Sequence, residues 1–511
     1  MRARSAISLG VVALMFVGVG AHAATAWFGI PVPKGMGNPH APVVDVANVR
    51  VPPARVPPGE ERYMELRGER IKADVAKIVD FSRESRRAGD RVWGRVTGFP
   101  AAKRTIEWVA ARFRDAGLEQ VEVQEYAAAP ETPMWWASSW EVRLIGDRAY
   151  GADTHDVVLE SAVPTSGSMI EGPSLEGPLV FAGSVGEALP AIDMKGKIAV
   201  QRVKPQRSAY SERRPTVERA NALAAQGAIA VLNVVEQTGN MHVRDFSNCR
   251  VPCFNLGAED GTFVQSVIER AAASGTAPVR VELTLAASRL SGLKGHNAVG
   301  IVHGTSDENI IVNAHADGWY DAAGDNADGL AVLLAMARHF AKLEHKPQRT
   351  LVFVASGGHH SAGLNGPANF VRANQAITAK TVMVVNLEHV AQLEIVPGQW
   401  IVKASEQPMS FGIDNASPFL HALGRRAMER YGFNLNPNFT NSVPGDLGGY
   451  APLGVARVQA IHSGPMYHVS GDVLETISIP GLERAARFFT YFVAEAAKAA
   501  RSEINPPKSA E

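Results

Sequence analysis

Four short aliphatic runs in the C-terminal half constrain the fold more than any other feature of this sequence. They are residues 299–302, 310–314, 350–355 and 381–387. The runs are rich in Val, Ile, Leu and Phe and show no clear alternation with polar residues, which is typical of strands covered by helices on both faces. Amphipathic helical patterns occupy residues 329–343, 417–431 and 480–501. We therefore expect a three-layer α/β/α sandwich built on a mixed sheet.

The N-terminal half divides into segments of different character. Residues 27–58 are rich in proline and are expected to form an extended arm. Apolar residues then recur at helical spacing over 60–86 and 101–116, and Gly117 is suited to end the second helix. The segment from about 165 to 288 contains short β-rich runs separated by turns, with one helix predicted over 216–226, and indicates a separate, mainly β module. The chain is therefore expected to divide into six segments, with the bounds 1–26, 27–58, 59–160, 161–290, 291–503 and 504–511.

The first 26 residues predict export. Arg2 and Arg4 precede an apolar run from Ile7 to Val19, which is followed by small residues such as Ala24 and Ala26. This is the pattern of a secretory signal peptide, so a periplasmic or secreted protein is expected, with an uncleaved anchor as the alternative. No later run reaches the roughly 18 apolar residues of a spanning helix, so no stable membrane insertion is expected after signal removal.

Neither the net charge nor the cysteine content indicates a binding partner. Lys plus Arg and Asp plus Glu each total 51, so no net field favours nucleic acid or an anionic membrane surface. The cysteines, Cys249 and Cys253, lie four positions apart. Export makes a disulfide between them possible, and two buried thiols are an equally good interpretation.

Polar residues gather where the predicted strands end. Ligands bind beyond the carboxyl ends of the strands in open α/β sheets, so these positions are the first candidates for a site. The segments are His315-Ala-Asp317, Gly324-Asp325-Asn326, Gly358-His359-His360, Asn386-Leu-Glu388-His389 and, in a last loop, Tyr467-His468. A zinc site needs imidazoles and carboxylates from separate elements, and a two-metal site also needs a bridging carboxylate. His315, Asp325, Glu388 and His468 can supply this set.

Over residues 60 to 500 these motifs resemble the di-zinc exopeptidases of the aminopeptidase S and carboxypeptidase Q type, in which a protease-associated domain interrupts the catalytic domain. The resemblance implies that His315 is a metal ligand and that Asp317 orients its imidazole. It implies that Asp325 is the bridging ligand, that Glu388 and His468 are further ligands, and that the Asp325–Asn326 peptide bond is cis. The β-rich segment at 161–290 resembles the inserted protease-associated domain.

The sequence departs from that family after the third aliphatic run. Members have two adjacent glutamates there, a general base and a metal ligand, whereas this chain has His359 and His360. Counting back from Gly363 instead places His360 and Ser361 at the two positions. Imidazole binds zinc and accepts protons near neutral pH, so we expect His360 to be a ligand and His359 to be the base.

The resemblance therefore predicts a zinc-dependent exopeptidase, with two ions or one, that acts on small peptides. The sequence leaves open whether it trims amino or carboxyl termini. The alternative is a catalytically degenerate peptidase fold that serves as a binding module. A serine hydrolase is not favoured, because no Gly-x-Ser-x-Gly motif stands at a strand end.

Overall fold

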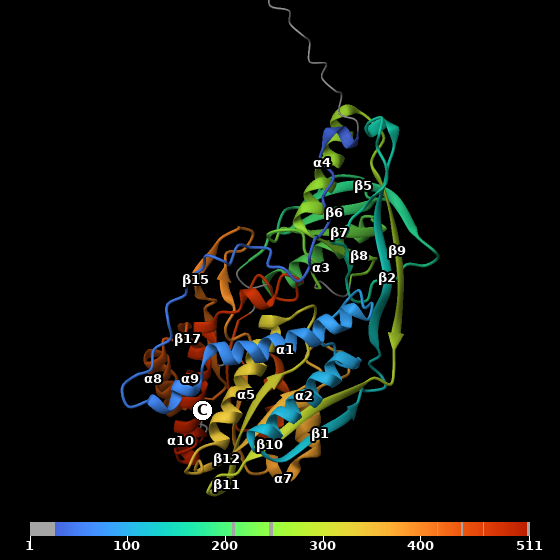
Figure 1. Cartoon of the computed structure of the whole chain (residues 1–511). Coiled ribbons are helices and arrows are strands. Elements are labelled where there is room, and N and C mark those ends of the chain that lie inside the picture. Colours follow the sequence, from blue (N-terminus) through green and yellow to red (C-terminus); the bar gives the residue numbers. More distant parts are fainter. Residues whose placement is uncertain are drawn as a thin grey trace, which may run out of the picture.

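The computed structural model of the chain describes residues 26–206, 210–244, 249–415, 417–440, 443–462 and 464–507. The predicted signal peptide lies outside them except for residue 26, and so do the last four residues of the predicted tail. Two sheets, each packed against helices, form a lower and an upper unit in Figure 1. The long strands β2 (Met134–Ile145) and β9 (Arg280–Leu290) run between the two units.

The central sheet belongs to the lower unit and is mixed, as the sequence predicts. Its order is β1-β10-β12-β11-β13-β18-β16-β17. Strand β11 is parallel to β12 and β13, and β13 is parallel to β18, whereas β1, β10 and β16 introduce antiparallel pairs. Its strands are β1 (Glu119–Ala127), β10 (Lys294–Val302), β11 (Ser306–His315), β12 (Arg349–Ser356), β13 (Thr381–Leu387), β16 (Met409–Ile413), β17 (Leu435–Thr440) and β18 (Ala456–Ile461). The four aliphatic runs are β10 to β13, which confirms them as strands.

Helices cover both faces of this sheet, so the three-layer prediction is confirmed. In β12, Phe353 packs into the cluster formed with α1, α2, α5, α8 and α9, while Val352 and Val354 pack on the opposite side with Phe370 and Tyr450. The first layer comprises α1 (Gly68–Arg87), α2 (Pro100–Ala116), α5 (Asp328–Ala341), α8 (Pro418–Tyr431) and α9 (Ile479–Ala496). The second comprises α6 (Gly366–Ala373) and the 3-10 segment η5 (Gly445–Leu453).

The second sheet forms the upper unit and has the order β3-β2-β9-β5-β6-β7-β8-β4. Its other strands are β3 (Val157–Val158), β4 (Val163–Pro164), β5 (Leu175–Ser184), β6 (Ile198–Val203), β7 (Ala230–Val235) and β8 (Cys253–Leu256). Helices α3 (Tyr210–Ala225) and α4 (Ala258–Ser274) pack against it in separate clusters, and the sequence predicted only α3. The sheet begins at Met134 and not at residue 161, because β2 pairs with β9 along its whole length.

The proline-rich arm lies across both units. It contains one short 3-10 turn, η1 (Trp27–Gly29), and Trp27 is fully buried against Tyr150 of the upper unit. Val44 packs with Met466, and Arg484 of α9 donates to the carbonyl of Pro52. The arm therefore contacts elements far apart in the sequence.

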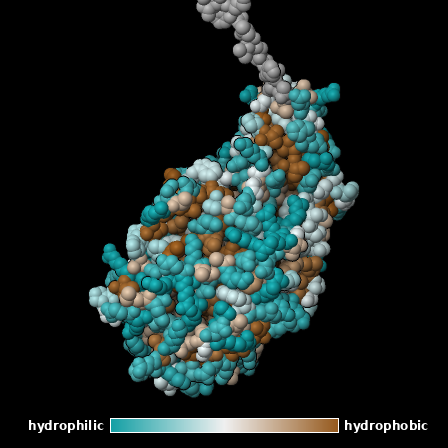
Figure 2. Space-filling model, viewed as in Figure 1, coloured by the Kyte–Doolittle hydropathy of each residue, from teal (hydrophilic) through white to brown (hydrophobic). Residues whose placement is uncertain are grey.

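The structure also bears on the expectations about the two cysteines and about membrane insertion. Cys249 and Cys253 carry thiols and form no disulfide, and their side chains hydrogen-bond to each other. Within the described part of the chain, no helix combines the length and the apolar character that crossing a membrane requires. Figure 2 shows hydrophilic residues over much of one face, with hydrophobic areas between them.

Candidate metal centre

The site forms at the carboxyl edge of the central sheet. Strand β11 ends at His315, β12 is followed by His359 and His360, and β13 is followed by Glu388 and His389. Because these three strands are parallel neighbours, their carboxyl ends lie at the same edge. The loop after β18 brings His468 to the same place. The strand ends and this loop thus bring together side chains as far apart in sequence as His315 and His468.

Asp325 lies at the centre of these imidazoles. Its Oδ1 is 3.0 Å from Nε2 of His389, 3.2 Å from Nε2 of His360 and 3.4 Å from Nε2 of His315. Its Oδ2 is 3.3 Å from Nε2 of His468. The carboxylate therefore presents one oxygen to three imidazoles and the other to a fourth.

The turn that carries Asp325 is fixed by hydrogen bonds to its backbone. It is η4 (Ala323–Ala327), directly before α5, and the Asp325–Asn326 bond is cis, as the resemblance implied. The carboxylate of Asp472 accepts the backbone N–H groups of Gly324 at 2.8 Å and Asp325 at 3.0 Å. The position of the central carboxylate thus depends on the loop after His468.

These side chains form overlapping groups with the composition of metal sites. Within each group, one donor atom per residue lies within 4.8 Å of the others. The groups are His315, Asp325 and His389; Asp325, His360 and His468; and His315, His359 and His360. The first two share Asp325, which is the arrangement expected for two ions bridged by one carboxylate.

The protonation of the first group fits a bound cation. Nδ1 of His315 donates to the carbonyl of Asp317 at 3.0 Å, and Nδ1 of His389 donates to the carbonyl of His462. In the neutral rings both Nε2 atoms then carry lone pairs, and these face the Asp325 carboxylate. Nε2 of His315 and Oδ2 of Asp325 are buried and have no hydrogen-bond partner among the described residues. A cation between them satisfies all of these acceptors.

Glu388, the expected ligand after β13, lies beside the first group. Its Oε2 accepts a hydrogen bond from Asn386 at 2.8 Å, and its Oε1 is 3.9 Å from Nε2 of both His315 and His389. His389, which the sequence analysis did not select, is the residue after β13 that lies against Asp325. The sequence could have indicated His389 by its position directly after Glu388, because this strand end then offers two adjacent side chains able to bind metal.

Asp317 also differs from its expected role. His315 donates to the backbone carbonyl of Asp317, and the carboxylate is farther away, with Oδ1 at 3.7 Å from Nδ1. The carboxylate instead accepts the backbone N–H groups of His359 at 3.2 Å and His360 at 3.0 Å. It therefore orients the turn that carries both histidines, because each of its oxygens holds one of the two N–H groups.

Of the two alignments left open by the sequence, the structure favours the pair His359 and His360. The Ser361 hydroxyl donates to the carbonyl of Thr97 and takes no part in the three groups. Nδ1 of His359 is 2.8 Å from Oδ1 of Asp446, and its Nε2 is 3.8 Å from Oε1 of Glu388. Asp446, in η5, had no sequence signal because it follows no predicted strand.

Burial and nearby carboxylates shift the pKa values of His359, His360 and His389 in different directions. Burial opposes a charge on His359, but Asp446 and Glu388 outweigh it and raise the pKa of His359 to about 10. Burial is likewise outweighed at His389, where Asp325 raises the pKa to about 9. Burial lowers the pKa of His360 to about 3 despite Asp325. Protons on His359 and His389 thus offset the carboxylates, as cations do in a metal-loaded site.

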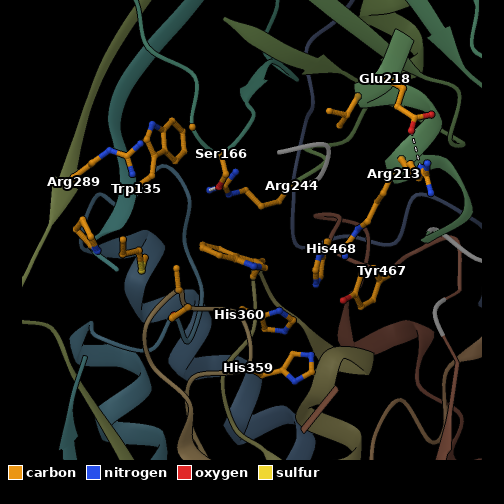
Figure 3. Close-up of a pocket in the computed structure, with 18 residues that line it drawn as sticks. Trp135, Ser166, Arg213, Glu218, Arg244, Arg289, His359, His360, Tyr467 and His468 are labelled. Atoms are coloured by element: carbon orange, nitrogen blue, oxygen red, sulfur yellow. Dashed lines mark hydrogen bonds and ion pairs between the residues drawn. The ribbon is translucent and has the colours of Figure 1, made fainter. Parts of the chain in front are cut away.

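A cavity of about 830 Å³ opens above this cluster, between the two units. Figure 3 shows His359 and His360 at its floor, His468 beside Arg213 at one side, and Arg244 and Trp135 opposite the floor. The floor comes from the central-sheet unit and the opposite wall from the upper unit. A cavity of this size accommodates a small organic molecule.

Comparison with known proteins finds similarity to peptidases. Residues 297–493 match the family model described as Peptidase family M28. The chain is 25% identical over 419 residues to Aminopeptidase YwaD of Bacillus subtilis (strain 168), covering 79% of this chain and 81% of the relative. These matches support a relation to peptidase family M28.

Solved structures share the fold. A peptidase M28 precursor from Shewanella amazonensis SB2B superposes with a TM-score of 0.66 at 17% identity, covering 86% of this chain and 96% of that one. BSAP, a zinc aminopeptidase from Bacillus subtilis, superposes with a TM-score of 0.55 at 20% identity, covering 86% of this chain and 98% of that one.

Proposed function

We propose that this relative of the M28 peptidases is a zinc-dependent exopeptidase that hydrolyses the terminal peptide bond of small peptides. The observation that carries the proposal is the pair of donor groups sharing Asp325 at the floor of the cavity. The likeness to a zinc aminopeptidase from Bacillus subtilis supports the choice of metal. Imidazole and carboxylate donors suit zinc.

His315, Asp325 and His389 would hold one ion, and Asp325, His360 and His468 the other. Bound zinc acidifies a water molecule and polarises the carbonyl group of the substrate. The second ion requires a change at His468. Arg213 donates to Nδ1 of His468 at 3.1 Å, which leaves the proton of the neutral ring on Nε2. Arg213 therefore has to turn away before Nε2 can bind metal.

His359 is proposed as the general base in place of the family's glutamate. Asp446 accepts the proton of Nδ1, so the ring is held with Nε2 toward Glu388 at the floor of the cavity. If bound cations replace the proton that Asp446 and Glu388 favour on His359, the neutral ring can take a proton from water at Nε2 and later release it to the leaving amine. The carboxylate of Asp446 stabilises the imidazolium formed between these steps.

The proposal also covers the parts of the sequence interpretation that concern location and domain identity. The signal pattern at residues 1–26 supports export, to the periplasm or the medium. The position of the upper unit, between two segments of the lower one, supports its identification as the protease-associated domain.

Metal content and hydrolysis test the proposal together. Protein prepared without chelator is analysed for zinc and assayed on a panel of dipeptides and their amino- and carboxyl-blocked forms. We expect up to two zinc ions per chain and cleavage of the unblocked peptides, with the blocked forms identifying the terminus that is trimmed. Zinc binding without cleavage would favour the degenerate binding module, and the absence of both would exclude the enzyme.

A further inference from the structure

The wall of the cavity opposite the metal centre is rich in arginine. The charged residues that line the cavity, apart from histidines, are Arg213, Arg214, Arg244, Arg289 and Glu218. Glu218 pairs with Arg214 at 2.7 Å on the exposed side of α3. The guanidinium groups of Arg213, Arg244 and Arg289 also line the cavity.

Arg244 is held rigidly in this wall. Its side chain lies between two indoles, 5.2 Å from the ring centroid of Trp135 and 4.9 Å from that of Trp319. It donates to Ser166 Oγ at 2.8 Å, and only 7% of the residue is exposed. Figure 3 shows Arg244 beside Ser166, across the cavity from His360. A guanidinium fixed in this way loses little conformational entropy when it binds a ligand.

Arg244 is also tied to the metal centre through the backbone. Its N–H donates to the carbonyl of His468 at 2.9 Å, and the preceding residue Val243 pairs with Val469. The distance from this guanidinium to the zinc donors is therefore set by a direct contact between the units. A ligand that spans the cavity meets the metal centre at one end and Arg244 at the other.

Arg213 adds a second guanidinium near the same space. It lies 5.4 Å from the ring centroid of Tyr467 and donates to His468. Its side chain lines the same cavity as that of Arg244. Two guanidiniums on one wall favour a planar anion, which they bind through paired N–H donors.

We infer that Arg244, assisted by Arg213, binds a carboxylate of the peptide substrate while the scissile bond lies over the metal centre. The inference rests on the proposed exopeptidase function and adds the substrate class to it. The carboxylate can be the free carboxyl terminus of a short peptide or the side chain of Asp or Glu. The chemistry is the same in both cases, so the test separates the two sources.

Binding is measured by calorimetry on the full chain, with and without zinc, so that the result does not depend on hydrolysis. The ligands are Ala-Leu, which carries only an α-carboxylate, Ala-Leu-amide, which carries none, and Ala-Glu-amide, which carries only a side-chain carboxylate. We expect at least one of the acids to bind the zinc-loaded protein about tenfold or more tightly than Ala-Leu-amide, because hydrogen bonds between charged groups are the strong ones. The preferred acid identifies the source of the carboxylate.

The variants are Arg244→Gln, Arg244→Lys and Arg213→Gln, with Arg214→Gln as the matched control. Arg244→Gln should reduce the acid preference to about twofold, and Arg244→Lys should retain part of it. Arg213→Gln, at a half-buried position, should reduce the preference without loss of folding. Arg214→Gln makes the same charge change at a residue already paired with Glu218, so the preference should remain.

Equal affinity of the wild type for both acids and Ala-Leu-amide would overturn the inference, as would an acid preference that survives both Arg244→Gln and Arg213→Gln. If the wild type binds acids through Arg244 but cleaves no peptide, the inference stands and the proposed function fails. If it cleaves peptides with no preference for acids, the proposed function stands and the inference fails.

Discussion

Each imidazole that stands in place of a carboxylate makes the metal centre less negatively charged. Around Asp325 lie His315, His360, His389 and His468, and Glu388 lies beside them with its Oε2 bonded to Asn386. Neutral imidazoles leave most of the charge of a bound zinc ion uncompensated. Such an ion is a stronger Lewis acid but is less tightly held, so each ligand matters more for occupancy.

His360→Ala tests the second donor group. Its Nε2 lies 3.2 Å from Oδ1 of Asp325, so the variant removes a ligand from that group and leaves His315 and His389 in place. We expect zinc content to fall from two ions per chain to one, measured by elemental analysis after gel filtration. The melting temperature of the metal-free protein should change little.

His345→Ala is the control, because His345 is an exposed histidine outside the site. Its zinc content should equal that of the wild type. An undiminished zinc content in His360→Ala would mean that His360 is not a ligand.

Asp446→Asn tests the positioning of the proposed base. Asp446 accepts the proton of Nδ1 of His359 at 2.8 Å, and the amide removes the charge that stabilises the imidazolium. We expect kcat to fall by about 100-fold, within the range of general base catalysis, with KM and zinc content little changed. The pH–rate profile should also shift, because Asp446 raises the pKa of His359. A fall in zinc content with an unshifted profile would indicate a structural role only.

The sequence identified the site's edge but not all of its residues. His315, Asp325, His360 and His468 were selected because they follow strands or match a motif, and the structure brings them together. Asp446 could not be found in this way, since it lies in η5 and follows no predicted strand. His389 was not selected because strand periodicity does not extend into the turn after β13, where the side chains of Glu388 and His389 are both buried.

At the scale of elements, the site depends on the close packing of the start of α5 against the end of β13. Asn326 donates to the carbonyl of Leu387 at 2.9 Å, and its Oδ1 accepts the N–H of His389 at 3.1 Å. A Cβ at Gly329 would lie 2.3 Å from Oδ1 of Asn326 and 2.6 Å from the carbonyl of Leu387. Glycine is therefore needed at the first turn of α5 to let the two elements meet.

Gly329→Ala should separate these elements. We expect a loss of about 1 to 3 kcal/mol in the free energy of unfolding, as for other overpacked sites, and a lower zinc content because His389 moves. Chemical denaturation and metal analysis measure the two effects. Gly448→Ala is the matched control, since a Cβ at Gly448 would meet nothing within 4 Å. Equal stability of the two variants would show that the contact at Gly329 is not restrictive.

Prediction was more successful for the elements of the central sheet than for those of the upper unit. The aliphatic runs and the helix ending at Gly117, whose φ is 90°, were readable because burial on both faces and a left-handed cap leave strong local signals. Helix α4 was missed, since its apolar residues were assigned to the β-rich module. The start of the upper sheet at β2 depends on pairing with β9 about 140 residues later, which no local pattern shows.

At the scale of the whole molecule, His242 lies where the two units meet. Its ring packs against Trp93 and Tyr320, and Nε2 donates to the carbonyl of Glu160 at 3.0 Å. Burial, reinforced by the nearby charges of Arg91 and Arg86, lowers the pKa of His242 to about 4. The folded protein therefore resists protonation at this residue, while the unfolded chain accepts the proton near the ordinary value of 6.5.

Stability should consequently fall as pH decreases from about 6.5 towards 4, because the unfolded state binds the proton first. His242→Gln keeps a donor for the Glu160 carbonyl and does not titrate. In urea denaturation of the metal-free proteins, we expect the wild type to lose about 1 to 2 kcal/mol more than the variant between pH 7 and pH 4.5. Parallel losses in the two proteins would contradict the assignment.

The arm at residues 27–58 has a consequence for the order in which the chain is made. Pro52 and Arg55 accept hydrogen bonds from Arg484 and Arg487, 432 residues later in each case. On a ribosome the arm emerges long before these partners exist. At about 5 to 20 residues per second, Pro52 and Arg55 wait some tens of seconds for these partners, a period in which a holding chaperone has access to this part of the arm. Docking of the arm on α9 is thus a step that only a nearly finished chain can take.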